Sequence, residues 1–438
     1  MTLLYLVFFV IFFLTRFAYQ PAWYDMSLQL SMVVVGFFFV MIGLKAKVST
    51  YTWWAIMFYH LLFAICMRMV NIEFYNDPFG SLPIDADFYD TLGQRFANDP
   101  FENLLNYLTL NGYKMDDFGY PFIVWSGYRI AGSYCNDLLL VVNAIIMSLG
   151  AYYLYKLSLN FVDKKFSKLI ALIWGVMPYA IYTTACGLKE NFFGFCVIMA
   201  FYAFFKYVKK KNVFNLCFCL LALGSLFFFR LAIGYFAILS MLSYFLLGMK
   251  FVKRHIKLFI FLALVVIVPL FPMITSSVLQ QRGYEYDSIV NVKNSKISES
   301  GGAVAQYANF AAGFIGPFPN FVSPDKIKRT YITIYSFTPF IKLLISFFFL
   351  YALYPVIKRK EIKMAPFVIF ILFNIIMMMF TFFTLHDRYH WPEIPLFMIV
   401  AAYGYIEYNK VKRKSIYRKL YRYYFLFVCL LIMFFNFR

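Results

Sequence analysis

Long runs of apolar residues, separated by polar segments, repeat along most of this chain. A run of about 20 mostly apolar residues is long enough to cross the hydrocarbon core of a bilayer as a helix. Such runs occupy residues 2–18, 27–44, 52–69, 136–159, 167–185, 192–207, 212–229, 232–249, 256–276, 337–355, 364–384, 394–408 and 420–436. The pattern therefore predicts an all-α polytopic membrane protein with about 13 transmembrane helices.

Two long polar segments interrupt the spans and divide the chain into five expected regions. The N-terminal transmembrane helices lie in 1–70, and residues 71–135 form a long loop with juxtamembrane helices. A transmembrane core follows in 136–276, a second long loop in 277–336, and the C-terminal transmembrane helices in 337–438. Loops of this length are usually functional or disordered. We expect the second one to be a lid or an acceptor-binding loop.

The first long loop contains a stretch with helical periodicity. Phe88, Leu92 and Phe96 recur at four-residue steps, which predicts an amphipathic helix on the membrane surface. Asp85 then lies at the helix N-terminus, where a carboxylate is favoured as a cap and by the helix dipole. Capping alone explains Asp85 as well as a functional role does.

A second stretch of this loop, GYPFIVWSGYRIAG (119–132), is apolar but too short to span a bilayer. We expect it to form a re-entrant or interfacial helix. Arg129 lies near its end. Its side chain either extends to the lipid headgroups, which we favour, or binds a phosphate.

Composition and charge agree with a membrane protein. Hydrophobic residues make up 63% of the chain and charged residues 14%, against about 45–50% and about 25% in soluble proteins. The mean hydropathy is +0.70. These values exclude a soluble enzyme, a disordered regulator and a secreted disulfide scaffold.

The net charge of +20 comes from 41 basic and 21 acidic residues, and its distribution indicates membrane orientation. Lys and Arg gather in one set of alternate connections, which the positive-inside rule places in the cytoplasm. Most acidic residues, with both long loops, then lie on the extracytoplasmic face. Orientation explains the basic excess, so we expect no nucleic-acid partner.

Several polar groups are predicted to meet on that same face. Lys189 and Glu190 lie between two apolar helices, Arg230 ends another, and His386 and Arg388 follow a fourth. Plain helix-end charges are the alternative interpretation. Cations facing an acidic loop would suit a lipid phosphate beside a carboxylate that activates a hydroxyl. Because the sequence contains no P-loop, Rossmann fingerprint or HExxH motif, the transferred group must arrive already activated in the membrane.

Five segments, in order along 85–408, resemble motifs of the GT-C glycosyltransferases, which use polyprenyl-phosphate sugars on the extracytoplasmic side. They are DADFYDTL (85–92), GYPFIVWSGYRIAG (119–132), Pro178 with LKE (188–190), GPFP (316–319), and Arg388 through Pro392 and Pro395 to AAYG (401–404). Residues 1–44 precede the family core and look like an addition to it.

The resemblance implies a site and a mechanism. Asp85 would be the general base that deprotonates an acceptor hydroxyl, which attacks the anomeric carbon with inversion as polyprenyl phosphate leaves. Ala86 stands where the family often has Glu, so Asp87 is the runner-up for the base. The other implied roles are a second carboxylate near the acceptor or an optional divalent cation (Glu190), donor-phosphate binding (Arg388, Arg230, Lys189, Arg129) and loop contacts (Tyr89, Tyr389, His386).

The leading interpretation is therefore a bacterial inner-membrane transferase with its active site on the periplasmic or extracellular face. We expect no resident cofactor, and we expect membrane lipids, a polyprenyl-phosphate-linked sugar and a glycan or glycolipid acceptor such as O-antigen or lipopolysaccharide as partners. The family's Lys before Pro-Pro-Leu is absent at 119–121, which argues against aminoarabinose or protein-mannose transfer. The alternatives are an O-antigen polymerase that uses diphosphate-linked repeat units, and a lipid or polysaccharide transporter.

Overall fold

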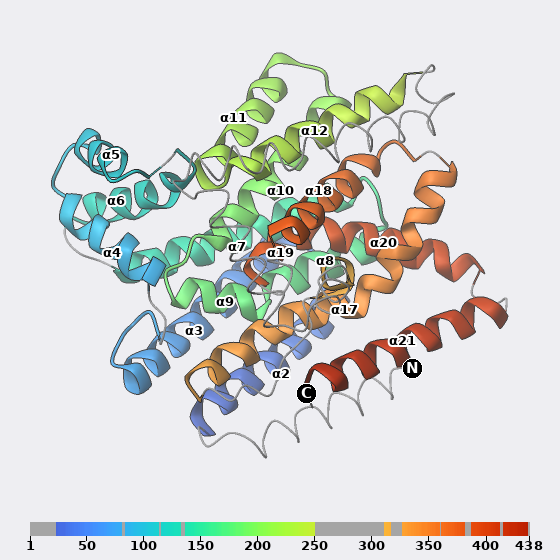
Figure 1. Ribbon diagram of the computed structural model, residues 1–438, viewed down its shortest axis with the longest axis horizontal. Helices are drawn as coiled ribbons and strands as arrows, with labels where there is room; N and C mark the ends of the chain where they lie inside the picture. Colours follow the sequence, from blue (N-terminus) through green and yellow to red (C-terminus); the bar gives the residue numbers. More distant parts are fainter. Residues whose placement is uncertain are drawn as a thin grey trace.

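The computed structural model describes residues 23–80, 84–113, 115–132, 136–249, 311–316, 326–359, 361–381, 387–411 and 415–436. These residues form helices joined by short connections, and no strand occurs among them (Figure 1). The predicted all-α fold is confirmed for this part of the chain. The predicted spans 2–18 and 256–276, residues 277–310 and 317–325 of the second long loop, and His386 lie outside the described residues.

The helices follow one another in an order close to the predicted one. The first half contains α2 (Trp23–Lys45), α3 (Thr50–Tyr75), α4 (Ile84–Phe96), α5 (Phe101–Leu110), the 3₁₀ turn η1 (Met115–Asp117), α6 (Gly119–Ala131), α7 (Asn136–Ser158), α8 (Lys164–Gly175) and α9 (Pro178–Ala185). The remainder contains α10 (Glu190–Lys209), α11 (Val213–Phe229), α12 (Leu231–Gly248), α17 (Lys326–Arg359), α18 (Ala365–Thr381), α19 (Asp387–His390), α20 (Ile394–Val411) and α21 (Ser415–Asn436).

Six helical segments in the described part are long and apolar enough to cross a membrane. They are Thr50–Tyr75, Asn136–Ser158, Lys164–Ala185, Glu190–Lys209, Leu231–Gly248 and Ile341–Arg359. Ser31–Lys45, Val213–Phe229 and Ala365–Met379 are shorter apolar helices. The count of about 13 spans stays a prediction.

One predicted span, 167–185, is broken into α8 and α9. The break falls at Met177, whose backbone is extended with φ −67° and ψ 122°. Pro178 follows as the first residue of α9. Proline disfavours a helical conformation in the residue before it and has no N–H to donate, so it ends one helix and starts the next.

The packing around Trp391 joins the C-terminal helices to the start of α10. Its indole stacks on Trp174 with ring centroids 4.5 Å apart, and its Nε1 donates to the Glu190 carbonyl at 2.9 Å. A Cβ at Gly194 would lie 2.8 Å from that same Nε1. Glycine is therefore required for α10 to approach the indole, and the contact fixes the position of Glu190 relative to the α19–α20 corner.

Helices α4, α5 and α6 form a unit at one side of the bundle (Figure 1). The predicted helix around residues 86–97 is present as α4. Its Leu92 and Phe96 are buried in a small core with Leu104 and Leu108 of α5. The apolar side of α4 thus faces protein, and Asp85 in its first turn projects toward the rest of the molecule.

Candidate active site

The structure brings three of the predicted site residues into direct contact. Arg388, from the short helix α19, donates through Nη1 to Asp85 Oδ2. Its Nε forms an ion pair with Glu190 Oε1 at the first residue of α10. Asp85 and Arg388 are 303 residues apart in sequence. One guanidinium therefore joins two carboxylates that come from separate helices.

The two carboxylates differ in exposure. The Asp85 side chain is 43% exposed and that of Arg388 is 31%, whereas that of Glu190 is 4%. Glu190 Oε2 is buried and accepts no hydrogen bond from the residues that the structure describes. Asp85 is thus the carboxylate that solvent or a substrate reaches, and Glu190 keeps an acceptor atom for a further donor.

Arg388 is held in its charged form. Burial opposes the charge, but the Glu190 and Asp85 carboxylates outweigh it and raise the pKa of Arg388 well above the usual arginine value. Charge-assisted hydrogen bonds of this kind are among the strongest in proteins. The guanidinium is therefore a fixed positive charge between the two acids.

Two further cations lie beside this group. Lys189 is the residue just before α10, and its Nζ lies 3.8 Å from Asp117 Oδ1 of η1. Burial, followed by the nearby Arg230, lowers the pKa of Lys189. The Arg230 guanidinium lies over the Tyr389 ring, 4.7 Å from its centroid. The site thus combines cations from three connections of the bundle.

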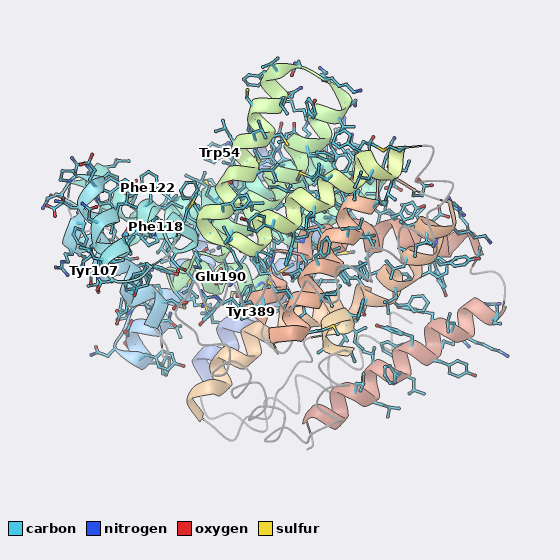
Figure 2. The ribbon with its side chains drawn as sticks, turned by 45° about the horizontal axis from the view of Figure 1, so that its top comes forward. Trp54, Tyr107, Phe118, Phe122, Glu190 and Tyr389 are labelled. Atoms are coloured by element: carbon cyan, nitrogen blue, oxygen red, sulfur yellow. The ribbon has the colours of Figure 1, made fainter. Side chains whose placement is uncertain are left out.

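The aromatic residues predicted as loop contacts line this site. Tyr89 is buried one turn after Asp85, and its ring meets that of Tyr120 edge-on with centroids 4.9 Å apart. Burial and the Asp85 charge raise the pKa of Tyr89 above its usual value, so its hydroxyl stays protonated. Figure 2 labels Tyr389, which lies in α19, and Glu190, which begins α10.

Two predicted residues lie away from the group. The Asp87 side chain is largely exposed on another side of α4. Partial desolvation, followed by the charges of Asp77 and Asp90, raises the pKa of Asp87. Arg129 donates to the Asp99 carbonyl at 2.6 Å and lies over the Trp125 ring. The structure does not bring either one to Arg388, so the geometry favours Asp85 over Asp87 as the base.

A buried ionic cluster behind α19 escaped the sequence analysis. Lys342 Nζ lies 2.5 Å from Glu393 Oε1 and 2.7 Å from His390 Nδ1. Asn374 Nδ2 donates to Glu393 Oε2 at 2.9 Å and to the Tyr389 carbonyl at 3.1 Å. The Lys342 and Glu393 side chains are 1% and 0% exposed. This cluster fixes α19, and hence Arg388, against α17 and α18.

Lys342→Met should destabilise the protein by about 3–5 kcal/mol, because it leaves the Glu393 carboxylate buried without its cation. The thermal unfolding midpoint in detergent measures the effect. Adding Glu393→Gln should restore much of the loss, since the amide is neutral and still accepts from Asn374. Unfolding of the single variant at the wild-type temperature would show that the ion pair does not support the fold.

Buried ionic residues of this kind can be noticed in the sequence, because they interrupt predicted membrane spans. Lys342 lies inside the predicted span 337–355, and Arg68 lies inside 52–69. An ionisable residue within a span is costly unless a partner neutralises it, so it is a functional candidate by default. The partner of Lys342 could not be predicted from the sequence, because Glu393 is 51 residues away.

The described residues contain no group of three or more His, Cys, Asp and Glu side chains placed to hold a metal ion. Asp85 and Glu190 both contact the Arg388 guanidinium. The arrangement that these residues present is a carboxylate pair bridged by a cation.

Comparison with known families supplies the class of protein. Residues 118–272 match the model of a family described as dolichyl-phosphate-mannose-protein mannosyltransferase, one of the GT-C families of polyprenyl-phosphate-sugar-dependent membrane glycosyltransferases. The resemblance to the GT-C superfamily is confirmed. Together with the long apolar helices of the described residues, this match indicates a multi-pass membrane protein.

The match has defined limits. It includes Lys189, Glu190 and Arg230, whereas Asp85 and Arg388 lie outside it. No curated protein and no solved structure matches the chain significantly. The match spans about a third of the chain and supports a membrane glycosyltransferase of the polyprenyl-phosphate-sugar type. The roles of individual residues are argued from the geometry above.

Proposed function

We propose that the protein transfers a sugar from a polyprenyl-phosphate donor to a hydroxyl of a lipid-linked or surface glycan, with inversion, on the extracytoplasmic face of a bacterial cytoplasmic membrane. The observation that supports this most is the contact of Arg388 with both Asp85 and Glu190. It brings α4 from the N-terminal part of the chain and α19 from the C-terminal part to one site, next to Lys189 and Arg230. A GT-C transferase needs both components there, a base and a set of cations for a phosphate.

The reaction follows from these groups. Asp85 accepts the proton of the acceptor hydroxyl, and the resulting oxygen nucleophile forms a bond to the anomeric carbon. The bond between that carbon and the phosphate oxygen breaks, and the electron pair leaves with polyprenyl phosphate. Arg388 stabilises the charge that develops on the phosphate, and Lys189 and Arg230 add to the positive potential.

The second carboxylate has a different role from the first. Glu190 is buried, and its Oε2 is open to a further donor. Once the side chains that cover this atom move aside on substrate binding, an acceptor hydroxyl other than the reacting one would supply that donor and so orient the sugar. Glu190 contacts Arg388 at Nε, whereas Asp85 contacts it at Nη1, so Glu190 keeps the cation in place when a substrate competes with Asp85 for it.

A donor panel tests the proposal. Purified protein in lipid nanodiscs is incubated with polyprenyl-phosphate monosaccharides, diphosphate-linked repeat units and glycolipid acceptors, and the products are followed by mass spectrometry. Consumption of a monophosphate donor is the expected result. Turnover of only the diphosphate-linked unit would indicate a polymerase, and movement of an unmodified lipid-linked glycan across the bilayer would indicate a transporter.

A further inference from the structure

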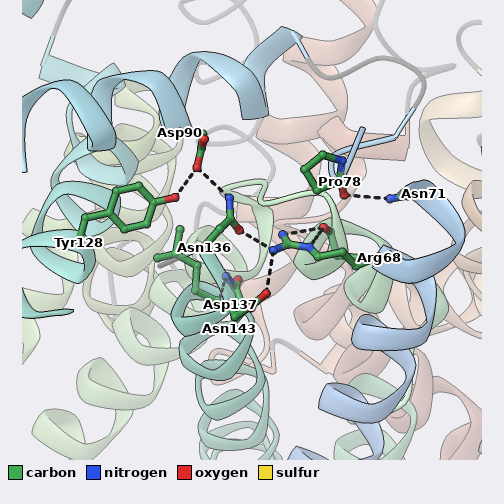
Figure 3. A network of polar contacts seen from close by, with 10 residues as sticks. Arg68, Asn71, Pro78, Asp90, Tyr128, Asn136, Asp137 and Asn143 are labelled. Carbon is green, nitrogen blue, oxygen red and sulfur yellow. Dashed lines mark hydrogen bonds and ion pairs between the residues drawn. The ribbon is translucent and has the colours of Figure 1, made fainter. Parts of the chain in front are cut away.

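A second polar network joins Asp90 of α4 to Tyr128, Asn136 and Arg68 (Figure 3). The Asp90 carboxylate is buried and accepts three hydrogen bonds. They come from the Tyr128 hydroxyl, from Asn136 Nδ2 at 2.8 Å and from Gln94 Nε2 at 2.6 Å. These bonds occupy three of the roughly four acceptor positions of a carboxylate. Buried and bonded within the protein in this way, Asp90 is not placed to accept a proton from a substrate.

The network continues from Asn136 to a buried arginine. Asn136 Oδ1 accepts from Arg68 Nη1 at 2.6 Å (Figure 3). Asn136 suits this place because an amide presents an acceptor to a guanidinium and a donor to a carboxylate at the same time. The same guanidinium donates to the Ala185 carbonyl from Nε at 3.1 Å and from Nη2 at 2.9 Å.

Arg68 is therefore linked to both segments that carry the candidate carboxylates: to α4 through Asn136 and Asp90, and to the end of α9 through the Ala185 carbonyl. Asp90 lies five residues after Asp85 on α4. Ala185 is the last residue of α9, and the turn that follows it leads directly into Glu190. Through Asn136 the guanidinium holds α4, and through Ala185 it holds the α9–α10 turn.

We propose that Arg68 and Asp90 are positioning residues that set the distance between Asp85 and Glu190. This inference rests on the proposed function of the two carboxylates. A cation in a membrane-spanning helix is costly and is retained where it has a task. Here the task is geometric, because general-base catalysis depends on a reacting geometry that a displacement of about 1 Å can slow by about 10²-fold.

Variants at two neighbouring positions provide the test. Asn136→Leu keeps a similar size but cuts the link between Arg68 and α4. Asp137→Asn is the matched control, because Asp137 lies 3.6 Å from Arg68 with a side chain that is 87% exposed. We expect Asn136→Leu to lower kcat by about 10²-fold with a donor KM within about threefold of the wild-type value. Asp137→Asn should leave both constants unchanged.

The Asp90→Asn variant separates positioning from catalysis. Its amide still accepts from Tyr128 and Asn136, and Gln94 can turn its own oxygen toward the new NH₂ group. We expect most of the activity to be retained. An Asp90→Asn protein with no more activity than Asp85→Asn would overturn the proposal, because the charge of Asp90 would then be needed for the reaction itself.

Two readouts distinguish positioning from plain support of the fold. A structural role alone would lower the folded yield and the unfolding temperature, with kcat per folded molecule unchanged. Unchanged kcat in Asn136→Leu would therefore contradict the proposal. A fall in donor affinity equal to the fall in kcat would contradict it as well, because none of the proposed phosphate-binding cations is on α4, the helix whose link to Arg68 this variant cuts.

Hydrogen exchange tests the same proposal without a substrate. Asn136→Leu should speed exchange in α4 only, whereas Arg68→Met should speed it both in α4 and in residues 186–190. Unchanged exchange in either segment of Arg68→Met would overturn the inference. If the wild-type protein transfers no sugar, the proposed function fails, and the exchange pattern still decides whether Arg68 couples the two segments.

Discussion

Replacing Asp85 with Asn should lower kcat by about 10²–10⁴-fold, the usual contribution of a general base. The amide has nearly the same shape as the carboxylate, but it cannot take the proton of the acceptor hydroxyl. Because Asp85 is 43% exposed, the substitution should leave the unfolding temperature and membrane insertion close to those of the wild type. Steady-state transfer by the purified variant measures the effect.

Asp87→Asn is the matched control on the same helix. Asp87 is exposed and lies away from Arg388, so this variant should retain wild-type activity. Loss of transfer in Asp87→Asn, with activity preserved in Asp85→Asn, would move the base to the runner-up position. Wild-type activity in both variants would remove α4 from the catalytic site.

Replacing Arg388 with Gln should lower kcat by about 10²–10³-fold, because the charge that develops on the leaving phosphate loses its main fixed cation. Arg388→Lys should recover only part of this loss. A lysine keeps one positive charge but lacks the planar fork that reaches Asp85 and Glu190 together. Arg388→Gln should also lower the unfolding temperature, because it leaves the buried Glu190 carboxylate without its partner.

Arg129→Gln is the control for the phosphate-binding cations. Arg129 donates to the Asp99 carbonyl, away from the site around Arg388. Loss of the Arg129 charge should therefore change donor KM and kcat by less than about threefold. A large rise in donor KM for Arg129→Gln would mean that the phosphate lies nearer to α6 than to α19.

The helical framework and much of the site were predictable from local sequence. Apolar runs of sufficient length predict helices directly, and the four-residue spacing of Phe88, Leu92 and Phe96 predicted α4 with Asp85 at its start. The break before α9 was not predicted, since 167–185 was expected to form one span, although its cause, Pro178, is local. Arg388 was predicted as a site residue because the segment that begins with it resembles a family motif.

The residues that organise the site were not predictable, because their partners are distant in sequence. Arg68 bonds to Asn136, 68 residues away, and to Ala185, 117 residues away. The position of Arg68 in a span marks it as unusual, but no spacing rule tells which carbonyl or amide it will meet. The same holds for Arg129, which the sequence placed either at the lipid headgroups or at a phosphate: its observed partner is the Asp99 carbonyl, 30 residues away, and its part in phosphate binding stays a prediction.

The most direct test of Asp85 as a general base is the anomeric configuration of the transferred sugar. The product made by the wild-type protein from a donor of known configuration is analysed by NMR. A base that activates the acceptor for a single displacement predicts inversion, whereas a carboxylate nucleophile predicts two displacements and net retention. An inverted product whose formation is lost in Asp85→Asn is the expected result. A product that retains the donor configuration would contradict the assignment of Asp85 as the base.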